Sequence, residues 1–133
     1  MDAHFCIAAA RRSLTHARRY LKTGEAVNWG CDNITSAIHW AMEGWLIGNG
    51  HHVTHRNGWL DTYQAFQKYA PDEFNAPLLK LYAQARYLEF VLMGDSDMRP
   101  AISIAEWEIK MRECLDNSEI TINALLTEIA RKG

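Results

Sequence analysis

Cysteine and proline are scarce in this chain of 133 residues, which contains three of each. Cys6, Cys31 and Cys114 lie far apart and form no C-x-x-C pair. The sequence therefore predicts neither a disulfide framework nor a thiolate zinc site. Because free cysteines suit a reducing compartment, we expect a cytoplasmic protein.

Long apolar runs are also absent, since no stretch approaches the length that a bilayer-spanning helix needs. Arg11 and Arg12 follow the first apolar run, whereas a secretory signal carries its basic residues before that run. We expect no contact with a membrane. The formal net charge is only -2, so the composition does not indicate a basic nucleic-acid-binding tail either.

The sequence shows no sustained alternation of apolar and polar residues, which would indicate β-strands, and no internal repeat. It also has no linker rich in Pro, Gly or Ser that would separate two domains. A chain of this length can bury most of its apolar surface in one core without metal or disulfides. We therefore predict a single domain over residues 1–133.

Apolar residues spaced three and four positions apart, the pattern of amphipathic helices, are abundant. They predict helices over about residues 3–22 and 57–69, and longer helices that begin near Asp32 or Asn33, at Asn75 and at Ser103. The predicted fold is all-α: an antiparallel up-and-down bundle of four main helices plus one short helix.

Local signals set the expected helix ends. Gly24 and Gly94 stop the first and fourth helices, and Gly48-Asn49-Gly50 ends the second. Ser103 and Glu106 form a capping box, and Pro77 is expected in the first turn of the fourth helix.

Large aromatic side chains are expected mostly in the core. The short helix offers an inward stripe of Trp59, Leu60, Tyr63, Phe66 and Gln67. Trp40 lies off the apolar stripe of its helix, and an exposed Trp40 beside Ile47 would mark a contact surface such as a dimer interface.

Three segments resemble the HEPN family, the higher-eukaryote-and-prokaryote nucleotide-binding domain, in an order that spans about residues 5–131. They are AIHWAMEGWLI (37–47), VTHRNGWLDTYQAF (53–66) and LYAQARY (81–87). The resemblance implies the same kind of helical bundle. It also implies a module that binds nucleotide or RNA, often beside a minimal nucleotidyltransferase, and that is an RNase toxin in many members.

The RNase members of that family carry an Arg followed four to six residues later by a His on the helix that corresponds to our fourth. Here no histidine follows Arg86 up to Met93. Without an imidazole to move protons, we predict a non-catalytic copy. The alternative is a metal-independent RNase toxin that uses a displaced pair, Arg11 and His16 on the first helix.

The predicted ligand-binding residues are Glu43, His55, Arg86, Tyr87 and His39. In this interpretation Glu43, His55 and Arg86 line a cleft, where Arg86 binds a phosphate and Tyr87 offers its ring to a base. In the structural alternative, a buried Glu43 needs a partner and pairs with Arg86, or Arg86 pairs with Glu89 three residues on.

His51, His52 and His55 raise the question of a metal site. Gly48 and Gly50 break the helix before them, so their spacing is not fixed on one helical face. We predict no metal and no cofactor, and we expect a polar loop in which His55 hydrogen-bonds the backbone.

One face of the first helix is basic, and it carries Arg11, Arg12, Arg18, Arg19 and Lys22. This stripe could follow an RNA backbone, but it is more typical of a solvated face or of one that meets the acidic fifth helix of a second protomer. The overall prediction is a homodimeric nucleotide- or RNA-binding module, possible partner of a separately encoded nucleotidyltransferase. A purely structural or interaction homodimer is the remaining alternative.

Overall fold

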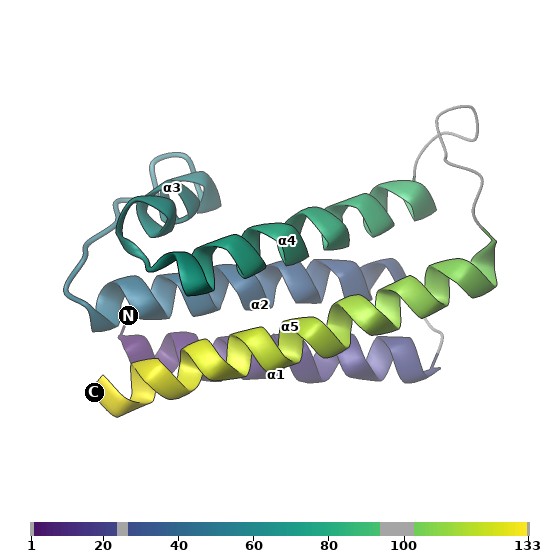
Figure 1. The fold of residues 1–133 in the computed structure, drawn as a ribbon, viewed down its shortest axis with the longest axis horizontal. Coiled ribbons are helices and arrows are strands. Elements are labelled where there is room, and N and C mark those ends of the chain that lie inside the picture. Colours follow the sequence, from purple (N-terminus) through teal and green to yellow (C-terminus); the bar gives the residue numbers. More distant parts are fainter. Residues whose placement is uncertain (1, 24–26, 94–102, 133) are drawn as a thin grey trace.

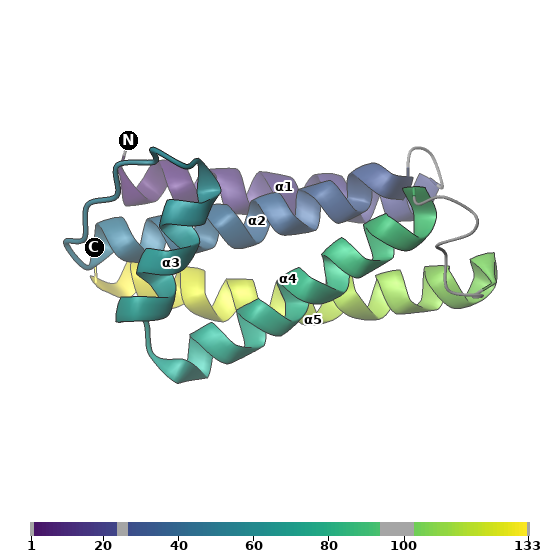
Figure 2. The same ribbon diagram turned by 90° about the horizontal axis from the view of Figure 1, so that it is seen from above.

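Five helices form the part of the chain that the computed structural model describes, residues 2–23, 27–93 and 103–132. They are α1 (Ala3–Thr23), α2 (Val27–Gly48), α3 (Trp59–Tyr69), α4 (Asp72–Met93) and α5 (Ile104–Lys132), and no β-strand occurs in these ranges. The four long helices run up and down beside one another, and α3 lies across one end of the bundle (Figures 1 and 2). The predicted all-α bundle is confirmed.

Small residues bring α1 and α2 into the closest contact of the bundle. Ala10, Ala17, Ala37 and Ala41 are fully buried. A Cβ atom added at Gly44 would lie only 3.0 Å from the Cβ of Cys6 and 3.5 Å from Cδ1 of Ile129. A side chain at position 44 would therefore require Cys6 of α1 to shift by a few tenths of an ångström, whereas its contact with Ile129 of α5 would be ordinary.

The core is a single apolar cluster to which all five helices contribute. Trp45 and Trp107 are buried as predicted, and Trp107 donates a hydrogen bond from Nε1 to the carbonyl of Leu88 at 2.9 Å. The predicted inward stripe of α3 is only partly confirmed. Phe66 is buried and Tyr63 is half-buried, but Thr62 is buried as well, and Trp59 and Leu60 are exposed by 36% and 52%. Since α3 packs chiefly against α2, it needs only a narrow buried face.

Two helices begin earlier than the predicted caps. The second helix starts at Val27 instead of near Asp32 or Asn33. The fourth starts at Asp72, because the carbonyl of Pro71 already accepts the backbone N–H of Asn75 at 3.0 Å. Asn75 is therefore no cap, and its side chain donates to the carbonyl of Gln67 at 3.4 Å across the α3–α4 corner. Pro77 consequently lies in the second turn rather than the first.

Two predicted helix ends are confirmed. At the end of α2, Gly50 has φ 80°, His51 N–H donates to the carbonyl of Leu46 at 2.8 Å, and Gly50 N–H donates to that of Ile47 at 3.1 Å. These two bonds around a left-handed residue are the Schellman arrangement. At the start of α5, Ser103 Oγ accepts the N–H of Glu106 at 3.1 Å. Gly24 and Gly94 lie outside the described residues.

Candidate functional site

A buried carboxylate, Glu43 of α2, lies at the centre of a small polar network. It is 4% exposed, and its Oε2 accepts the hydroxyl proton of Thr62 at 2.8 Å. The same oxygen lies 2.9 Å from Nε2 of His55, which is itself 3.1 Å from Oγ1 of Thr62. Three elements, α2, the loop before α3 and α3 itself, therefore meet at one oxygen atom. Thr62 is the member of this network that the sequence prediction missed.

Backbone geometry carries His55 to this network. His55 has φ 56° and Gly58 has φ 63°, and the N–H of Gly58 donates to the carbonyl of His55 at 3.2 Å. A left-handed conformation is costly for a residue with a side chain, so the contact with Glu43 offsets local strain. Asp61 fixes the same turn by accepting the N–H of Asn57 at 3.0 Å. The sequence predicts a hydrogen bond between His55 and the backbone. The carbonyl of His55 accepts the N–H of Gly58, while its ring Nε2 contacts the side chains of Glu43 and Thr62.

The network can hold structure but offers no nucleophile. Thr62 is fully buried and its proton is committed to Glu43. A triad would need the hydroxyl free to reach a substrate, with the base oriented by its second ring nitrogen. Here one nitrogen of His55 contacts both partners. The arrangement therefore acts as a latch that holds the loop and α3 on α2, and we call Glu43, Thr62 and His55 the latch.

Trp59 lies beside His55 of the latch, at the centre of an aromatic cluster. Its ring stacks on His39 with centroids 5.0 Å apart and an interplanar angle of 17°, and meets Trp40 edge-on at 5.0 Å. Trp40 is half-buried, and Phe5 of α1 covers it at 5.5 Å. Rings from the chain's own α1 and α3 therefore pack against Trp40 and cover part of the surface expected there.

Two hollows open on either side of this cluster. The His39 hollow has a volume of about 220 Å³ and is lined by His39, Trp59, Leu60, Tyr63 and Tyr82. The His55 hollow has a volume of about 270 Å³ and is lined by Trp40, His55, Gly58 and Trp59. Trp59 forms part of the wall of both hollows.

Burial lowers the pKa of His39 from the ordinary 6.5 to about 4, and the positive charge of Arg86 lowers it in the same direction. The imidazole is therefore neutral at pH 7 and offers one donor and one acceptor to the hollow. Burial also raises the pKa of Tyr63 above its usual range. The walls of the His39 hollow are thus uncharged and mostly aromatic, and their polar atoms lie at the edges of the rings.

Arg86 lies near the His39 hollow without lining it, since its charge acts on His39. It lies four residues after Tyr82 on α4, which places both on one face of the helix. Its guanidinium pairs with Glu89 at 3.2 Å, as one structural alternative predicted, and its side chain is 58% exposed. Glu43 is bound by the latch instead, so the alternative pairing of Glu43 with Arg86 is wrong.

Tyr87 lies apart from the other predicted binding residues. It is 43% exposed and stands five residues after Tyr82, about 140° around the helix at 3.6 residues per turn. Phe90, three residues on and 49% exposed, shares its face. Tyr82, and not Tyr87, is the tyrosine of α4 that lines the His39 hollow. The structure thus brings Glu43 and His55 together, and separately His39 and Arg86.

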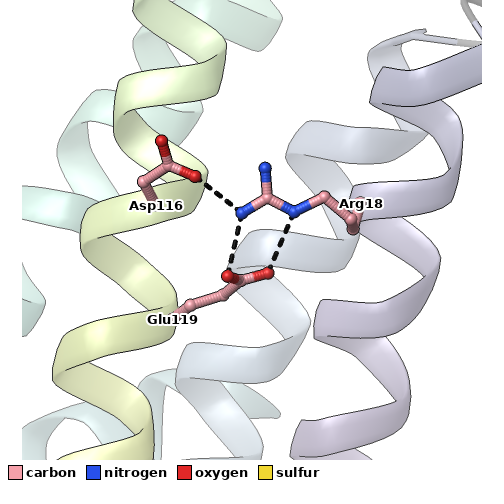
Figure 3. Close-up of polar contacts among 3 residues, drawn as sticks. All are labelled: Arg18, Asp116 and Glu119. Atoms are coloured by element: carbon pink, nitrogen blue, oxygen red, sulfur yellow. Dashed lines mark hydrogen bonds and ion pairs between the residues drawn. The ribbon is translucent and has the colours of Figure 1, made fainter.

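The basic stripe of α1 is partly neutralised within the chain. Arg18 donates to Asp116 at 2.6 Å and binds both carboxylate oxygens of Glu119, from Nε at 3.2 Å and Nη2 at 2.8 Å (Figure 3). The acidic partner is thus α5 of the same chain. Arg11 and His16 are exposed on α1, about 140° apart around its axis.

In the loop between α2 and α3, which carries His51, His52 and His55, two of the histidine rings pack against or bond other side chains. His51 stacks on Tyr69 with centroids 4.0 Å apart, and His55 belongs to the latch. Within the described ranges, no group of three His, Cys, Asp or Glu side chains could hold a metal ion.

None of the described helices combines the length and apolarity that a bilayer crossing requires. Comparisons with protein-family models, with curated proteins and with solved structures found no match to this chain.

Proposed function

We propose that this chain is a non-catalytic module that binds a nucleotide, or a nucleotide unit of RNA, in the His39 hollow. The observation that carries the proposal is an aromatic hollow with an arginine nearby: Trp59, Tyr63 and Tyr82 form walls, and Arg86 follows Tyr82 by one helical turn and acts electrostatically on His39. Aromatic walls stack on the face of any base, and a guanidinium binds phosphate in a bidentate manner.

The size and chemistry of the His39 hollow suit one base. Its volume of about 220 Å³ lies below the range of about 300–1,000 Å³ that encloses a drug-sized ligand, so sugar and phosphate would stay outside. A neutral His39 can hydrogen-bond a base edge as donor or acceptor. The Arg86 side chain is 58% exposed, whereas its partner Glu89 is 18% exposed, so a phosphate can approach the guanidinium from solvent while Glu89 stays paired.

The non-catalytic part of the proposal rests on proton transfer. No histidine follows Arg86 on α4 within the range of the RNase members. The charge of Arg86 acts on the imidazole of His39, whose pKa is about 4. His39 is therefore a weak base at neutral pH, because general bases work best when their pKa lies near the working pH.

The proposal extends to partners. We include a cytoplasmic setting, a second copy of this chain and a separately encoded minimal nucleotidyltransferase, as the HEPN resemblance implies. Tyr87 and Phe90 support a protein partner, because two large exposed aromatic side chains share one face of α4.

The test is thermal and calorimetric titration with AMP, GMP, CMP and UMP. A nucleotide at one hundred times its Kd should stabilise the fold by about 2.7 kcal/mol. Arg86→Ala should abolish that shift while keeping the helical circular-dichroism spectrum, whereas Arg19→Ala, which removes an exposed charge on α1, should keep it.

Two results would reject the proposal. If none of the four nucleotides changes the melting temperature or gives heat of binding, the chain is an interaction protein. If its expression degrades cellular RNA and His16→Ala prevents this, the displaced-pair RNase is the correct alternative.

A further inference from the structure

We infer that the site accommodates two consecutive bases of a single strand, one in the His39 hollow and one in the His55 hollow, with Trp59 between them. This inference rests on the proposed function and names its ligand class: a single-stranded dinucleotide step rather than a free mononucleotide.

The first argument is the pairing of the hollows. They have similar volumes, about 220 and 270 Å³, and share Trp59 as a common wall. One nucleotide would fill only one of them. Adjacent bases that are splayed around an aromatic side chain fill both, and sequence-tolerant binding of single strands uses such rings.

The second argument is the position of the cations. Arg86 follows Tyr82 of the His39 hollow by one turn, and the exposed Arg56 follows His55 of the other hollow directly in sequence. Each hollow therefore has an arginine close in the chain to one of its lining residues, and a strand carries one phosphate per base.

The third argument concerns nearby negative charge, which would repel a strand. The Glu43 carboxylate is 4% exposed and engaged by the latch, so it lies beneath the surface that the strand would cross. Asp61 accepts both the backbone and the side-chain N–H groups of Asn57, at 3.0 and 3.3 Å. Glu89, which also lies close to Asp32, is paired with Arg86 at 3.2 Å.

The latch fixes the loop that forms one wall of the His55 hollow. His55 and Gly58 both adopt positive φ, and the bond from His55 to Glu43 fixes the loop against α2. The hollow is therefore preformed, and a second base binds without paying to order the loop.

The experiment compares Kd values, measured by tryptophan fluorescence, for AMP, for the 5′-phosphorylated dinucleotide pApA and for a twelve-base-pair RNA duplex as probes. Expected is binding of pApA about tenfold or more tighter than AMP, since a further stacked base and phosphate are engaged. Arg56→Gln should weaken pApA about tenfold and leave AMP unchanged. Arg86→Gln should weaken both, and Arg19→Gln should weaken neither.

The outcomes separate this inference from the proposed function. Equal affinity for AMP and pApA, or an Arg56→Gln variant that binds pApA like wild type, overturns the two-base inference and leaves nucleotide binding in place. Tighter binding of the duplex than of pApA overturns it in favour of charge-driven contact. If neither AMP nor pApA binds, the inference and the proposed function fail together.

Discussion

At the scale of single residues, Glu43 shows how a buried charge becomes an organising contact. A carboxylate that is 4% exposed needs hydrogen-bond donors, because its desolvation costs several kcal/mol when it is unpaired. Thr62 supplies one donor from α3, and His55 approaches from the loop. The hydrogen bond between Thr62 and Glu43 thus holds α3 against α2. Trp59, three residues before Thr62, then forms part of the wall of both hollows.

We predict that Thr62→Val lowers the free energy of unfolding by about 2 kcal/mol, because valine keeps the shape of threonine but leaves the buried carboxylate short of a donor. Urea denaturation measures the change. Thr127→Val, at an exposed position of α5, is the matched control. Its free energy of unfolding should change by no more than about 0.5 kcal/mol. Equal stability of the two variants would show that Thr62 contributes nothing through its hydroxyl.

His39 gives a pH-dependent prediction. Its pKa is about 4 in the folded chain and about 6.5 in the unfolded one, so between these values the unfolded state binds more protons. Stability must therefore fall as the pH drops below 6.5, by about 1–2 kcal/mol at pH 5. His39→Gln should remove that part of the pH dependence in urea titrations at pH 7 and pH 5. An unchanged slope in the variant would contradict the lowered pKa, which NMR titration of the His39 ring checks directly.

At the scale of elements, α1 packs close to α2 because the residues between the two helices are glycine and alanine, which have little or no side chain. Gly44 faces the Cβ of Cys6, an atom bound directly to the α1 backbone, so relief of a clash requires movement of the whole helix. Gly48, one turn later on the same face, meets only Cγ2 of Ile129 at 3.5 Å.

We predict opposite effects for two glycine-to-alanine changes in α2. Gly44→Ala should lower the melting temperature, because overpacking costs about 1–3 kcal/mol and exceeds the gain of about 1 kcal/mol in helix propensity. Gly48→Ala should be neutral or stabilising, since ordinary van der Waals contact leaves only the propensity gain. A more stable Gly44→Ala variant would mean that α1 packs farther from α2 than described.

At the scale of the whole molecule, stability and binding are divided between different parts. The four long helices share one core, whereas α3 packs chiefly against α2 and crosses the end of the bundle (Figure 2). Elements with few buried contacts open at lower free energy than the core. The walls of both hollows depend on α3, so the candidate site lies on the least secured helix.

Native-state hydrogen exchange should therefore show faster opening of residues 59–69 than of α2 or α5. His55→Ala should accelerate exchange in α3 selectively, since it removes the loop from the latch. His52→Ala, at an exposed position three residues earlier, should leave exchange in α3 unchanged. Equal acceleration across all five helices would show that His55 stabilises the global fold instead.

The sequence by itself determined the helical character of the chain and several of its ends. Periodic apolar spacing and the Gly48-Asn49-Gly50 and Ser103–Glu106 signals act within one or two helical turns, so they need no knowledge of the rest of the chain. The same local reasoning located Glu43, since a carboxylate beside an apolar stripe must be partly buried.

Only the tertiary structure decided which polar groups meet. Glu43 and Thr62 are 19 residues apart, and Arg18 and Glu119 are 101 apart, so their encounter depends on how helices pack. Packing also placed Trp59 at the surface, because a helix on the flank of a bundle buries a narrow face. Distances between helices arise from all the side chains between them, and no local pattern encodes that sum.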